Sequence, residues 1–556
     1  MRRKFFILAI LALQIVSGQE FISPVAHEIR LAGTFGELRS NHFHMGIDIK
    51  SSNRSSGDPI FAVEKGHISR VLVSRSGFGN AVYIDHPSGH TTIYGHLRNF
   101  SVKLDSLVSS IQEKRQSFEI NEQFSVGEIP IIKGEQIGNM GNSGSSYGPH
   151  LHFEIRDTKT EVPINPIRFG FKLSDKTAPI IKNIKIYSLD DQYREIDSKT
   201  VSPTTIGNNA YRLSDQEIPA WRVGFGIQTY DPMNSGYNKN GIYEMTLSVD
   251  GEESYHFKFD SISYTNTRYL NAHIDYKHYK NTRARFHRCF KLKGNHLPMY
   301  EKEDKSIVEL YQNKPREIEI HAVDFEGNHS KVAFKIKRDT SMYGVKPKVF
   351  NYHLSYKEPN VIQQNEIEIY FPDSCLYEDL FLYINKSESE YLTDVYHLGS
   401  DEVPLHKPIT FSLKPDSVPE NLKNKACIIE CSEPGRIKTY GGRWEGNSFV
   451  CTLYEFGNYA LFYDTLAPQI TPLTSFTGSK IQFRIEDNYS DSGTAKGLQY
   501  FATIDGQWAK FEYDLKRNLL TYKVPPSLSN GTEHIMILKV SDDRGNTTEF
   551  SKKFFR

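Results

Sequence analysis

Two histidines two residues apart are the first side chains in this sequence whose spacing suggests chemistry. They are His150 and His152, and they follow a glycine-rich run that begins at Gly138. In a β-strand, residues i and i+2 point to the same face of the sheet. Two imidazoles on one face are typical of a metal-binding or proton-transfer site.

A second group of candidate ligands lies about a hundred residues upstream, where the chain reads His44-x-Gly46-x-Asp48. The alternating Met45, Ile47 and Ile49 indicate the inward side of a strand. His44, Gly46 and Asp48 would then share the other side, and the glycine would leave room for an ion. Histidine and carboxylate ligands suit zinc. With one histidine from the downstream pair they give three ligands and an open position, which is the arrangement of a catalytic zinc site.

The combination of these motifs resembles a known family. His44-x-Gly46-x-Asp48, Tyr94-x-His96-Leu97 and Gly148-Pro-His-Leu-His-Phe-Glu154 are similar to the lysostaphin/LytM-like zinc metallopeptidases, which cut peptide bonds of bacterial peptidoglycan. The resemblance covers about residues 27–170. It implies an antiparallel β-sheet metallopeptidase domain of the duplicated hybrid motif type.

The resemblance also implies roles for individual residues. It places the metal ligands at His44, Asp48 and His152, with one Zn²⁺ per chain, and the catalytic histidines at His96 and His150. We assign His150 as the base that accepts the proton of the attacking water, and His96 as the donor that stabilises the oxyanion. The sequence does not separate these two roles, which could be exchanged.

The neighbouring histidines and glycines have simpler interpretations. His42 is not expected to be a ligand, because the three-ligand site is already complete. His86 and His90 flank a Pro-Ser-Gly turn and are expected to face solvent at a hairpin end. The glycines from Gly138 to Gly148 lead into a strand, not into a helix, so a phosphate-binding loop is disfavoured.

The rest of the chain is expected to be mainly β, with the metallopeptidase domain at 19–173 followed by about three β-sandwich domains. Between residues 101 and 126 the sequence predicts a helical insertion beside the cleft, because Leu104, Leu107, Val108 and Ile111 recur at helical spacing.

An internal sequence repeat supports the sandwich prediction. Three landmarks recur in the same order, and they pair Asp175 with Asp464, Asp231 with Asp487, and Asp324 with Asp542. Coincidence among turn residues is the alternative, but order and spacing favour two copies of one immunoglobulin-like sandwich. We place them at 174–340, with an insertion at about 269–310, and at 464–556, with a third sandwich-like domain at 341–463.

Two further sequence features have competing interpretations. The basic, aromatic run from Tyr276 to Arg288 would either contact anionic glycan or form a solvated loop, and we favour the solvated loop. The five cysteines would be buried thiols or form one disulfide among Cys427, Cys431 and Cys451. A zinc site at Cys427 and Cys431 is disfavoured, because a second ligand pair is missing.

The first residues predict export. Arg2, Arg3 and Lys4 precede a short apolar segment and then Ser17-Gly18, which is the form of a signal peptide at 1–18. That segment is too short to span a bilayer, and no integral membrane segment is expected. The location would be the periplasm, or the cell surface or extracellular space of a bacterium. The charges balance, with 67 Lys and Arg against 67 Asp and Glu, so no nucleic-acid partner is expected.

The function predicted from the sequence is that of a secreted zinc metalloendopeptidase acting on stem or cross-bridge peptides of peptidoglycan, with sandwich domains that position it or bind envelope proteins. One alternative is a non-catalytic envelope adaptor that recruits or activates another wall hydrolase. Another is a protease that acts on proteins.

Overall fold

The computed structural model describes residues 21–234, 238–303, 305–311, 314–339, 349–431, 438–491, 497–528 and 531–556. The expected signal peptide at 1–18 therefore lies outside the described residues. Strands dominate the described chain, and most of them pair antiparallel, so the prediction of a mainly β fold is confirmed.

Buried apolar side chains form four large clusters along the chain. We name the corresponding segments the N-terminal domain (21–173), the second domain (174–339), the third domain (349–463) and the C-terminal domain (464–556). The boundaries expected from the sequence, and the immunoglobulin-like type of the second and C-terminal domains, stay predictions.

The N-terminal domain contains a nine-stranded sheet and a three-stranded sheet. Every pair in them is antiparallel. The large sheet has, in order, β1 (Leu31–Gly33), β2 (Ile47–Lys50), β11 (His150–Asp157), β6 (His90–Gly95), β5 (Ala81–Asp85), β4 (Gly66–Val73) and β8 (Ile120–Gln123), with β12 (Pro163–Ile164) beside β11 and β9 (Pro130–Ile131) beside β4. The small sheet has β3 (Pro59–Phe61), β10 (Gln136–Met140) and β7 (Leu97–Phe100), and a short helix η1 (Pro166–Phe169) ends the domain.

Helix α1 (Val102–Arg115) lies within the insertion expected from the sequence. Leu104 and Val108 are buried, and Leu107 and Ile111 pack partly buried against the N-terminal core, as their helical spacing indicates. The helix does not lie where we expected it. It lines a cavity of about 780 Å³ together with Trp508 and Lys510 of the C-terminal domain, away from the histidines.

The second domain packs two sheets around one core. The first has β14 (Glu195–Val201), β13 (Ile180–Leu189), β18 (Arg222–Tyr230), β21 (His287–Arg288) and β23 (Val308–Glu309). The second has, in order, β15 (Thr204–Gly207), β16 (Ala210–Arg212), β25 (His329–Arg338), β24 (Arg316–Val323), β19 (Glu244–Val249), β20 (Glu252–Lys258) and β22 (Tyr300–Lys302). Strand β17 (Gln216–Ile218) also pairs with β25, and both β16 and β17 run parallel to it. Helices η2 (Tyr264–Tyr269), α2 (Leu270–His273) and α3 (Tyr276–Thr282) follow β20.

The remaining domains are also built from paired sheets. The third domain has three sheets and helix η3 (Glu420–Lys425). The sheets are β26 (Tyr352–Leu354) with β29 (Leu380–Leu382); β27 (Asn360–Gln363), β28 (Ile367–Phe371), β32 (Ile409–Leu413), β36 (Ser448–Leu453) and β35 (Gly442–Glu445); and β30 (Ile384–Ser387), β31 (Val395–Leu398), β37 (Gly457–Tyr463), β33 (Ala426–Glu430) and β34 (Lys438–Tyr440). Strand β40 (Ser490–Asp491) of the C-terminal domain joins the last of these sheets, parallel to β34. The C-terminal domain has β38 (Gln469–Pro472), β39 (Lys480–Glu486), β44 (Leu519–Lys523) and β43 (Phe511–Asp514), then β42 (Gln507–Trp508), β41 (Gln499–Ile504), β45 (Glu533–Ser541) and β46 (Thr547–Phe555), with helix η4 (Leu515–Arg517).

The echoed segments make the same hydrogen bonds in the second and C-terminal domains. Asn328 donates its backbone N–H to Asp324 and its amide Nδ2 to the carbonyl of Asp175. Asn546 donates in the same way to Asp542 and to the carbonyl of Asp464. The two repeated segments therefore form the same local hydrogen-bonded structure in both domains.

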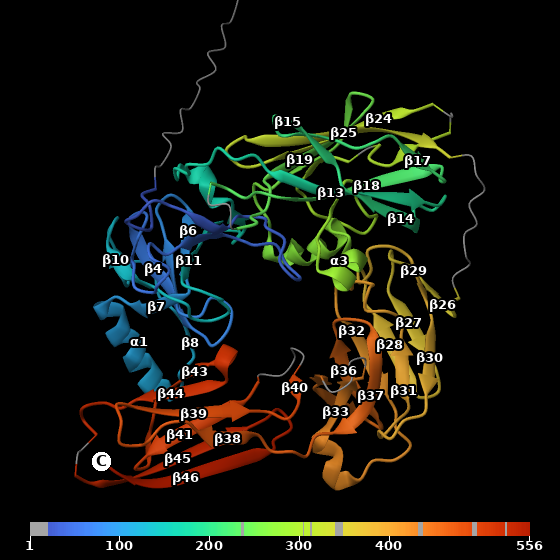
Figure 1. Ribbon diagram of the computed structural model, residues 1–556. Coiled ribbons are helices and arrows are strands. Elements are labelled where there is room, and N and C mark those ends of the chain that lie inside the picture. The colour runs from blue at the N-terminus through green and yellow to red at the C-terminus, as the bar shows by residue number, and fades with distance from the viewer. Residues whose placement is uncertain are drawn as a thin grey trace, which may run out of the picture.

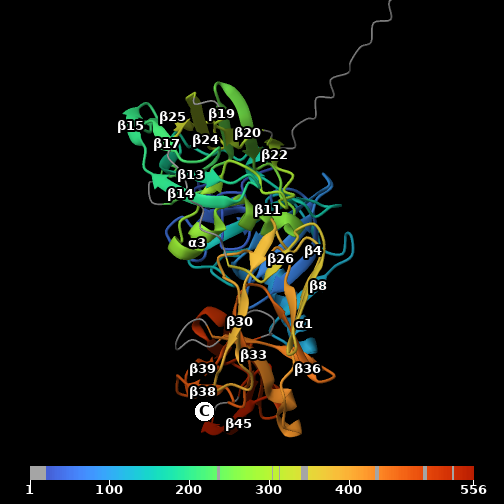
Figure 2. The ribbon, with the colours of Figure 1, turned by 90° about the vertical axis from the view of Figure 1, so that its right-hand side faces the viewer.

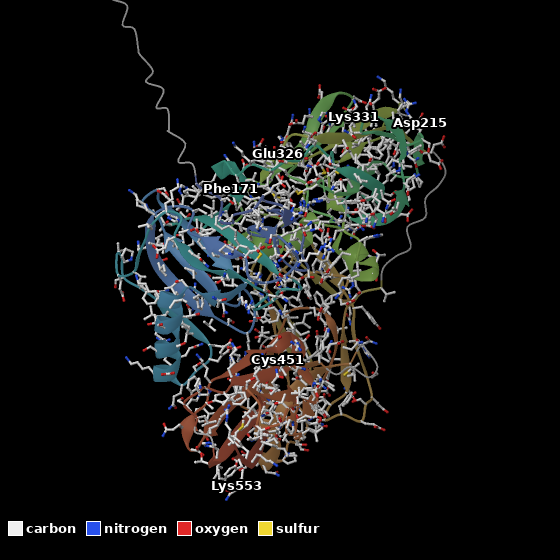
Figure 3. The ribbon with its side chains drawn as sticks, turned by 60° about the vertical axis from the view of Figure 1, so that its left-hand side comes forward. Phe171, Asp215, Glu326, Lys331, Cys451 and Lys553 are labelled. Atoms are coloured by element: carbon white, nitrogen blue, oxygen red, sulfur yellow. The ribbon has the colours of Figure 1, made fainter. Side chains whose placement is uncertain are left out.

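The domains follow one another around a ring, and the C-terminal domain returns to the N-terminal domain (Figures 1 and 2). Arg75 donates to the carbonyl of Leu498 over 2.8 Å, and Lys516 donates to the carbonyls of Asn142 and Ser146 over 2.7 and 2.9 Å. In the stick view, Phe171 and Glu326 lie near the junction of the first two domains (Figure 3).

The structure corrects two expectations and decides a third. The run from Tyr276 to Arg288 is not a solvated loop: it includes α3, whose Lys280 pairs with Asp401 of the third domain over 2.8 Å. His86 is buried, with its Nδ1 donating to the carbonyl of Lys65 over 2.9 Å, and does not face solvent. All five cysteines are free thiols.

Candidate active site

The candidate ligands come together because two strands of the large sheet are direct neighbours. In the pairing of β2 with β11, His152 lies opposite Asp48. On its other side β11 pairs with β6, so that His152 lies opposite Gly95 and His96 follows immediately. His44 lies three residues before β2, which begins at Ile47. Sequence alternation therefore placed Asp48 and His152 correctly, whereas His44 reaches the site from an irregular segment.

Three ligand atoms converge, and we call His44, Asp48 and His152 the histidine cluster. Asp48 Oδ1 lies 3.0 Å from His44 Nε2 and 3.0 Å from His152 Nδ1, and these two nitrogens lie 3.1 Å apart. Zinc–ligand bonds of 2.0–2.1 Å in tetrahedral geometry put neighbouring ligand atoms about 3.3 Å apart. The spacing therefore fits a small tetrahedral ion with two nitrogen ligands and one oxygen ligand.

Outer partners decide which atom of each ligand faces the centre. His44 Nδ1 donates to the carbonyl of Thr34 over 2.8 Å, which leaves Nε2 free for a metal. His152 Nε2 donates to Glu154 Oε1 over 2.9 Å, which leaves Nδ1 free. Arg39 donates to Asp48 Oδ2 over 2.9 Å, which leaves Oδ1 available to a metal. The three atoms that these outer partners leave available to a metal therefore point to one place.

The electrostatics of the cluster keep the carboxylates charged. Burial opposes ionisation of Asp48, but His44, His150 and His152 hold its pKa well below the usual range. Burial also disfavours the charged form of His152, yet its bonds to Asp48 and Glu154 outweigh this and raise its pKa to about 9. In the metal-free protein, a proton thus occupies the nitrogen that a metal would take.

The two remaining histidines lie beside the cluster with their rings in edge contact, 4.7 Å between centroids. His96 Nδ1 donates to the carbonyl of Ser143 over 2.8 Å, and His150 Nδ1 donates to that of Gly148 over 2.9 Å. Carbonyl oxygens only accept, so each ring keeps a free Nε2 when it is neutral. Burial and the neighbouring His152 and His150 lower the pKa of His96 to about 3, so it is neutral here.

A cavity of about 1430 Å³ opens beside the cluster and gives access to it. His44, Asp48, His96, His150 and His152 all line it. The other charged lining residues are mostly basic: Arg30, Arg39, Lys50, Arg54 and Arg285 against Glu37. His42 lines the cavity too, but it does not belong to the ligand set, since the three ligand atoms that lie within 4.8 Å of one another are those of the histidine cluster.

Gly46 has a different purpose from the one we inferred. A Cβ atom there would lie 2.4 Å from the carbonyl oxygen of Phe153 and 3.1 Å from His152 Nε2. The glycine therefore allows the segment before β2 to cross closely over β11. It does not make room for the ion itself.

Sequence reasoning missed the outer partners of the ligands. Glu154 was detectable, because it follows His150 and His152 at the same two-residue interval on β11. Thr34 acts through its backbone carbonyl, and no residue type encodes that role. Tyr264 comes from the second domain, where its hydroxyl donates to Glu154 Oε1 over 2.6 Å. Nothing in the local sequence connects it to the site.

Parts of the chain are similar to known protein families. Residues 42–113 and 121–166 match the model of peptidase family M23, and residues 351–464 match that of a Zu5-like domain. The DD-carboxypeptidase/endopeptidase Mpg of Neisseria meningitidis serogroup B is 31% identical over 161 residues, which are 28% of this chain and 30% of that protein. The cell division protein DipM of Caulobacter vibrioides is 28% identical over 147 residues, 26% of this chain and 20% of that protein.

Among solved structures, the catalytic domain of the antimicrobial peptidase lysostaphin from Staphylococcus simulans is 23% identical, with a TM-score of 0.19. The match covers 25% of this chain and 91% of that one. The chain spans less than a third of the length of the two curated relatives.

Proposed function

We propose, from the premise that the N-terminal domain belongs to the LytM-like peptidases of family M23, that this protein is an exported zinc-dependent metalloendopeptidase that hydrolyses peptide bonds of bacterial peptidoglycan. The observation that carries the proposal is the convergence of three potential ligand atoms, with two further histidines beside them, on one open cavity.

His44, Asp48 and His152 would hold the metal, each through the atom that its outer partner leaves free. A bound Zn²⁺ would polarise the scissile carbonyl and lower the pKa of a water molecule toward neutrality. The protein's own contribution is the fixed orientation of these ligands and a cavity large enough for a peptide.

His150 is placed to act as the base. Its free Nε2 lies 3.4 Å from Asp48 Oδ1, so it borders the centre and can accept the proton of the attacking water. The same nitrogen can then return the proton to the leaving amine. His96 is more buried than His150, and its lowered pKa keeps the resting ring neutral. Its Nε2 can therefore donate to the oxyanion only if the negative charge that forms there draws a second proton onto the ring. We keep His150 as base and His96 as oxyanion donor, with the exchanged assignment as the alternative.

The charge of the cavity supports an anionic peptide as the substrate. Five basic residues and one acidic residue line it outside the histidine cluster, and Arg285 is contributed by the second domain. Stem peptides of peptidoglycan carry free carboxylates, which such a surface attracts. The name of the Neisseria relative, a DD-carboxypeptidase/endopeptidase, agrees with this substrate class.

Export is the remaining part of the proposal. It depends on the signal peptide expected at 1–18, and peptidoglycan as substrate requires a location in the cell envelope. Within the part of the chain that the structure describes, no helix has the length and hydrophobicity needed to cross a bilayer. We further propose that the downstream domains position the enzyme or bind envelope proteins.

Metal content and turnover, measured together on the mature protein, test the proposal. We expect one zinc per chain by elemental analysis and cleavage of defined muropeptides by mass spectrometry. His152→Ala should lose both, because it removes a ligand. His42→Ala is the matched control in the same cavity, and it should retain both.

The other outcomes are equally informative. Zinc-free protein whose digestion of the wall survives His152→Ala would contradict the mechanism. A wall phenotype insensitive to loss of His96 or His150 would indicate a non-catalytic adaptor. Cleavage of glycine-rich polypeptides without turnover of muropeptides would indicate a protease that acts on proteins.

A further inference from the structure

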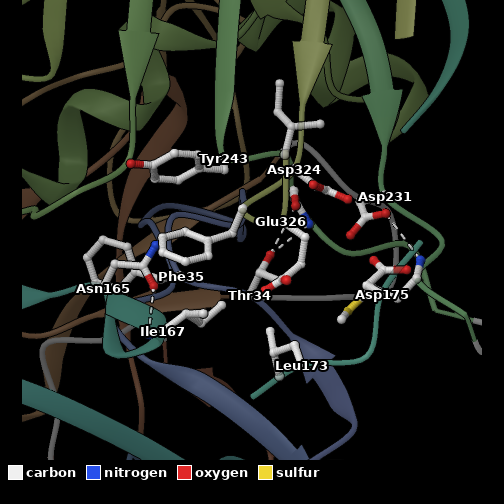
Figure 4. Close-up of a pocket in the computed structure, with 14 residues that line it drawn as sticks. Thr34, Phe35, Asn165, Ile167, Leu173, Asp175, Asp231, Tyr243, Asp324 and Glu326 are labelled. Atoms are coloured by element: carbon white, nitrogen blue, oxygen red, sulfur yellow. Dashed lines mark hydrogen bonds between the residues drawn. The ribbon is translucent and has the colours of Figure 1, made fainter. Parts of the chain in front are cut away.

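A second group of potential ligands lies in the second domain, at its junction with the N-terminal domain. The carboxyl groups of Asp175, Asp231 and Asp324 each offer an oxygen within 4.8 Å of the others, and all three residues are buried. Asp175 precedes β13, Asp231 follows β18, and Asp324 follows β24 (Figure 4). We call these three residues the aspartate cluster.

The negative charge of this cluster has no counterpart in the described chain. The three carboxylates accept hydrogen bonds from the backbone N–H groups of Thr177, Met233, Gly327 and Asn328, and from the Asn328 amide. Among the described residues, no lysine, arginine or histidine forms an ion pair with any of the three. No hydrogen bond joins one of these carboxyl groups to another in the same residues. Buried charges without partners are costly, so a cation beside the three carboxylates would stabilise them.

An independent observation comes from Asn240. This side chain is 1% exposed, and neither its Oδ1 nor its Nδ2 has a hydrogen-bond partner. Asn240 and Asp231 exchange two backbone hydrogen bonds of 2.9 Å each across an antiparallel bridge. Directly opposed residues of such a pair project to the same side, so the Asn240 amide lies on the side of the Asp231 carboxylate. A buried, unpaired amide carbonyl on that side can supply a fourth oxygen ligand.

The available space matches one ion. A cavity of about 20 Å³ lies against the cluster, and Asp175, Asp231 and Asp324 all line it (Figure 4). About 10–15 Å³ suffices for a single water-sized particle. We propose that the aspartate cluster and Asn240 form a binding site for one Ca²⁺ ion. Oxygen ligands select hard cations, and several carboxylates in irregular geometry suit Ca²⁺ better than the strictly octahedral Mg²⁺.

The position of the site gives the ion a structural role between two domains. Met233 and Phe325 directly follow the ligand loops, and both pack against the core of the N-terminal domain. Gly241, next to Asn240, donates its N–H to Thr34 Oγ1 over 3.0 Å and accepts from the same hydroxyl over 3.1 Å. An ion that joins the three loops would therefore fix the surface on which the N-terminal domain rests.

The repeated segment of the C-terminal domain supplies an internal control. Asp464, Asp487 and Asp542 also approach within 4.8 Å, but Asp487 is exposed. In the sequence, the residue before Gly497 is Lys496, where the second domain has Asn240 before Gly241. A lysine offers no oxygen ligand, and we assign no ion to this second group.

Calorimetric titration of the mature full-length protein with Ca²⁺, after removal of divalent ions on a chelating resin, tests the site. We expect one Ca²⁺ per chain and a rise in the melting temperature with Ca²⁺ concentration. Asp231→Asn should weaken Ca²⁺ binding at least tenfold, and Asn240→Ala should weaken it severalfold. Asp487→Asn, the matched control, should bind Ca²⁺ like the wild type.

Asp231→Asn preserves size and removes one of three mutually repelling charges, so the variant is expected to fold, which circular dichroism checks. Absence of both heat and thermal shift at millimolar Ca²⁺ would overturn the site. Unchanged affinity in folded Asp231→Asn would do the same. Equal affinity for Mg²⁺ would overturn the assignment to Ca²⁺.

Discussion

The histidine cluster and the aspartate cluster each bring three potential ligand atoms within 4.8 Å of one another, yet they differ in chemistry and access. The first offers two nitrogens and one oxygen beside a cavity of about 1430 Å³. The second offers only oxygens beside a cavity of about 20 Å³. Mixed ligands with open access suit a reacting zinc ion, whereas enclosed carboxylates suit a structural calcium ion.

The two clusters also differ in how their ligands are held. Each ligand of the histidine cluster has an outer partner that fixes the atom facing the centre. In the aspartate cluster the carboxylates receive backbone N–H groups at turns. Outer partners tune the reactivity of a metal, and turns only position an ion.

The largest effect should come from the histidines beside the metal ligands. We expect His150→Ala and His96→Ala to lower the turnover number by about 10²–10⁴-fold, because each removes a proton-transfer or oxyanion-stabilising group. Zinc content and Ca²⁺ affinity should stay unchanged, since neither residue is a ligand. Steady-state kinetics on a defined muropeptide, with elemental analysis, provides the measurement. Loss of zinc from either variant would show that the residue is a ligand.

A smaller effect is expected from the outer partner of His152. Glu154→Gln keeps the shape of the side chain but removes the charge that accepts the His152 Nε2 proton. We expect zinc affinity to fall about 10–100-fold, as for other outer-shell substitutions. Competition with a zinc chelator measures it. The Ca²⁺ titration serves as the control, and a parallel loss of Ca²⁺ affinity would mean that the substitution disturbs the whole fold.

Sequence reasoning succeeded where the function depends on alternation along one strand. His150 and His152 share a face of β11, as the two-residue periodicity indicates, and the pairing of β2 with β11 places Asp48 opposite His152. It failed where the partner comes from another domain. Tyr264 reaches Glu154 from the second domain, and Lys280 pairs with Asp401 of the third, so a run that appears solvated in the sequence is packed.

The aspartates illustrate a second limit. In the sequence, Asp231 and Asp324 resemble ordinary turn residues, and they served only as landmarks of a repeat. Their function as a group depends on burial and on the unpaired amide of Asn240. Neither property is encoded in a local pattern, because both arise when three loops meet at a domain junction.

The pH dependence of metal binding should separate the clusters. The pKa of His152 is raised to about 9, so below that pH zinc must displace one proton, and zinc affinity should rise up to about tenfold per pH unit. Burial, then repulsion from Asp175 and Asp324, raises the pKa of Asp231 to about 7. Ca²⁺ affinity should therefore increase up to about pH 7 and then level off. Titrations between pH 5 and 9, with total buffer ions held constant, compare the two profiles, and identical profiles would contradict the assignment.

The smallest effect concerns Thr34, which contacts His44 of the histidine cluster and Gly241, the neighbour of Asn240. Thr34 bonds Gly241 through its hydroxyl and His44 through its backbone carbonyl. Thr34→Val removes only the first contact and leaves the Gly241 groups unpaired, at a cost of about 1–3 kcal/mol. We expect a lower melting temperature and Ca²⁺ affinity reduced severalfold. Zinc affinity should stay unchanged, because the carbonyl is retained.

Thr34→Ser is the matched control, since it keeps the hydroxyl and should behave like the wild type. A fall in zinc affinity in Thr34→Val would indicate that the two clusters are energetically coupled. In that case Ca²⁺ must strengthen zinc binding by the same factor by which zinc strengthens Ca²⁺ binding. Zinc titrations with and without Ca²⁺ decide between independent sites and coupled ones.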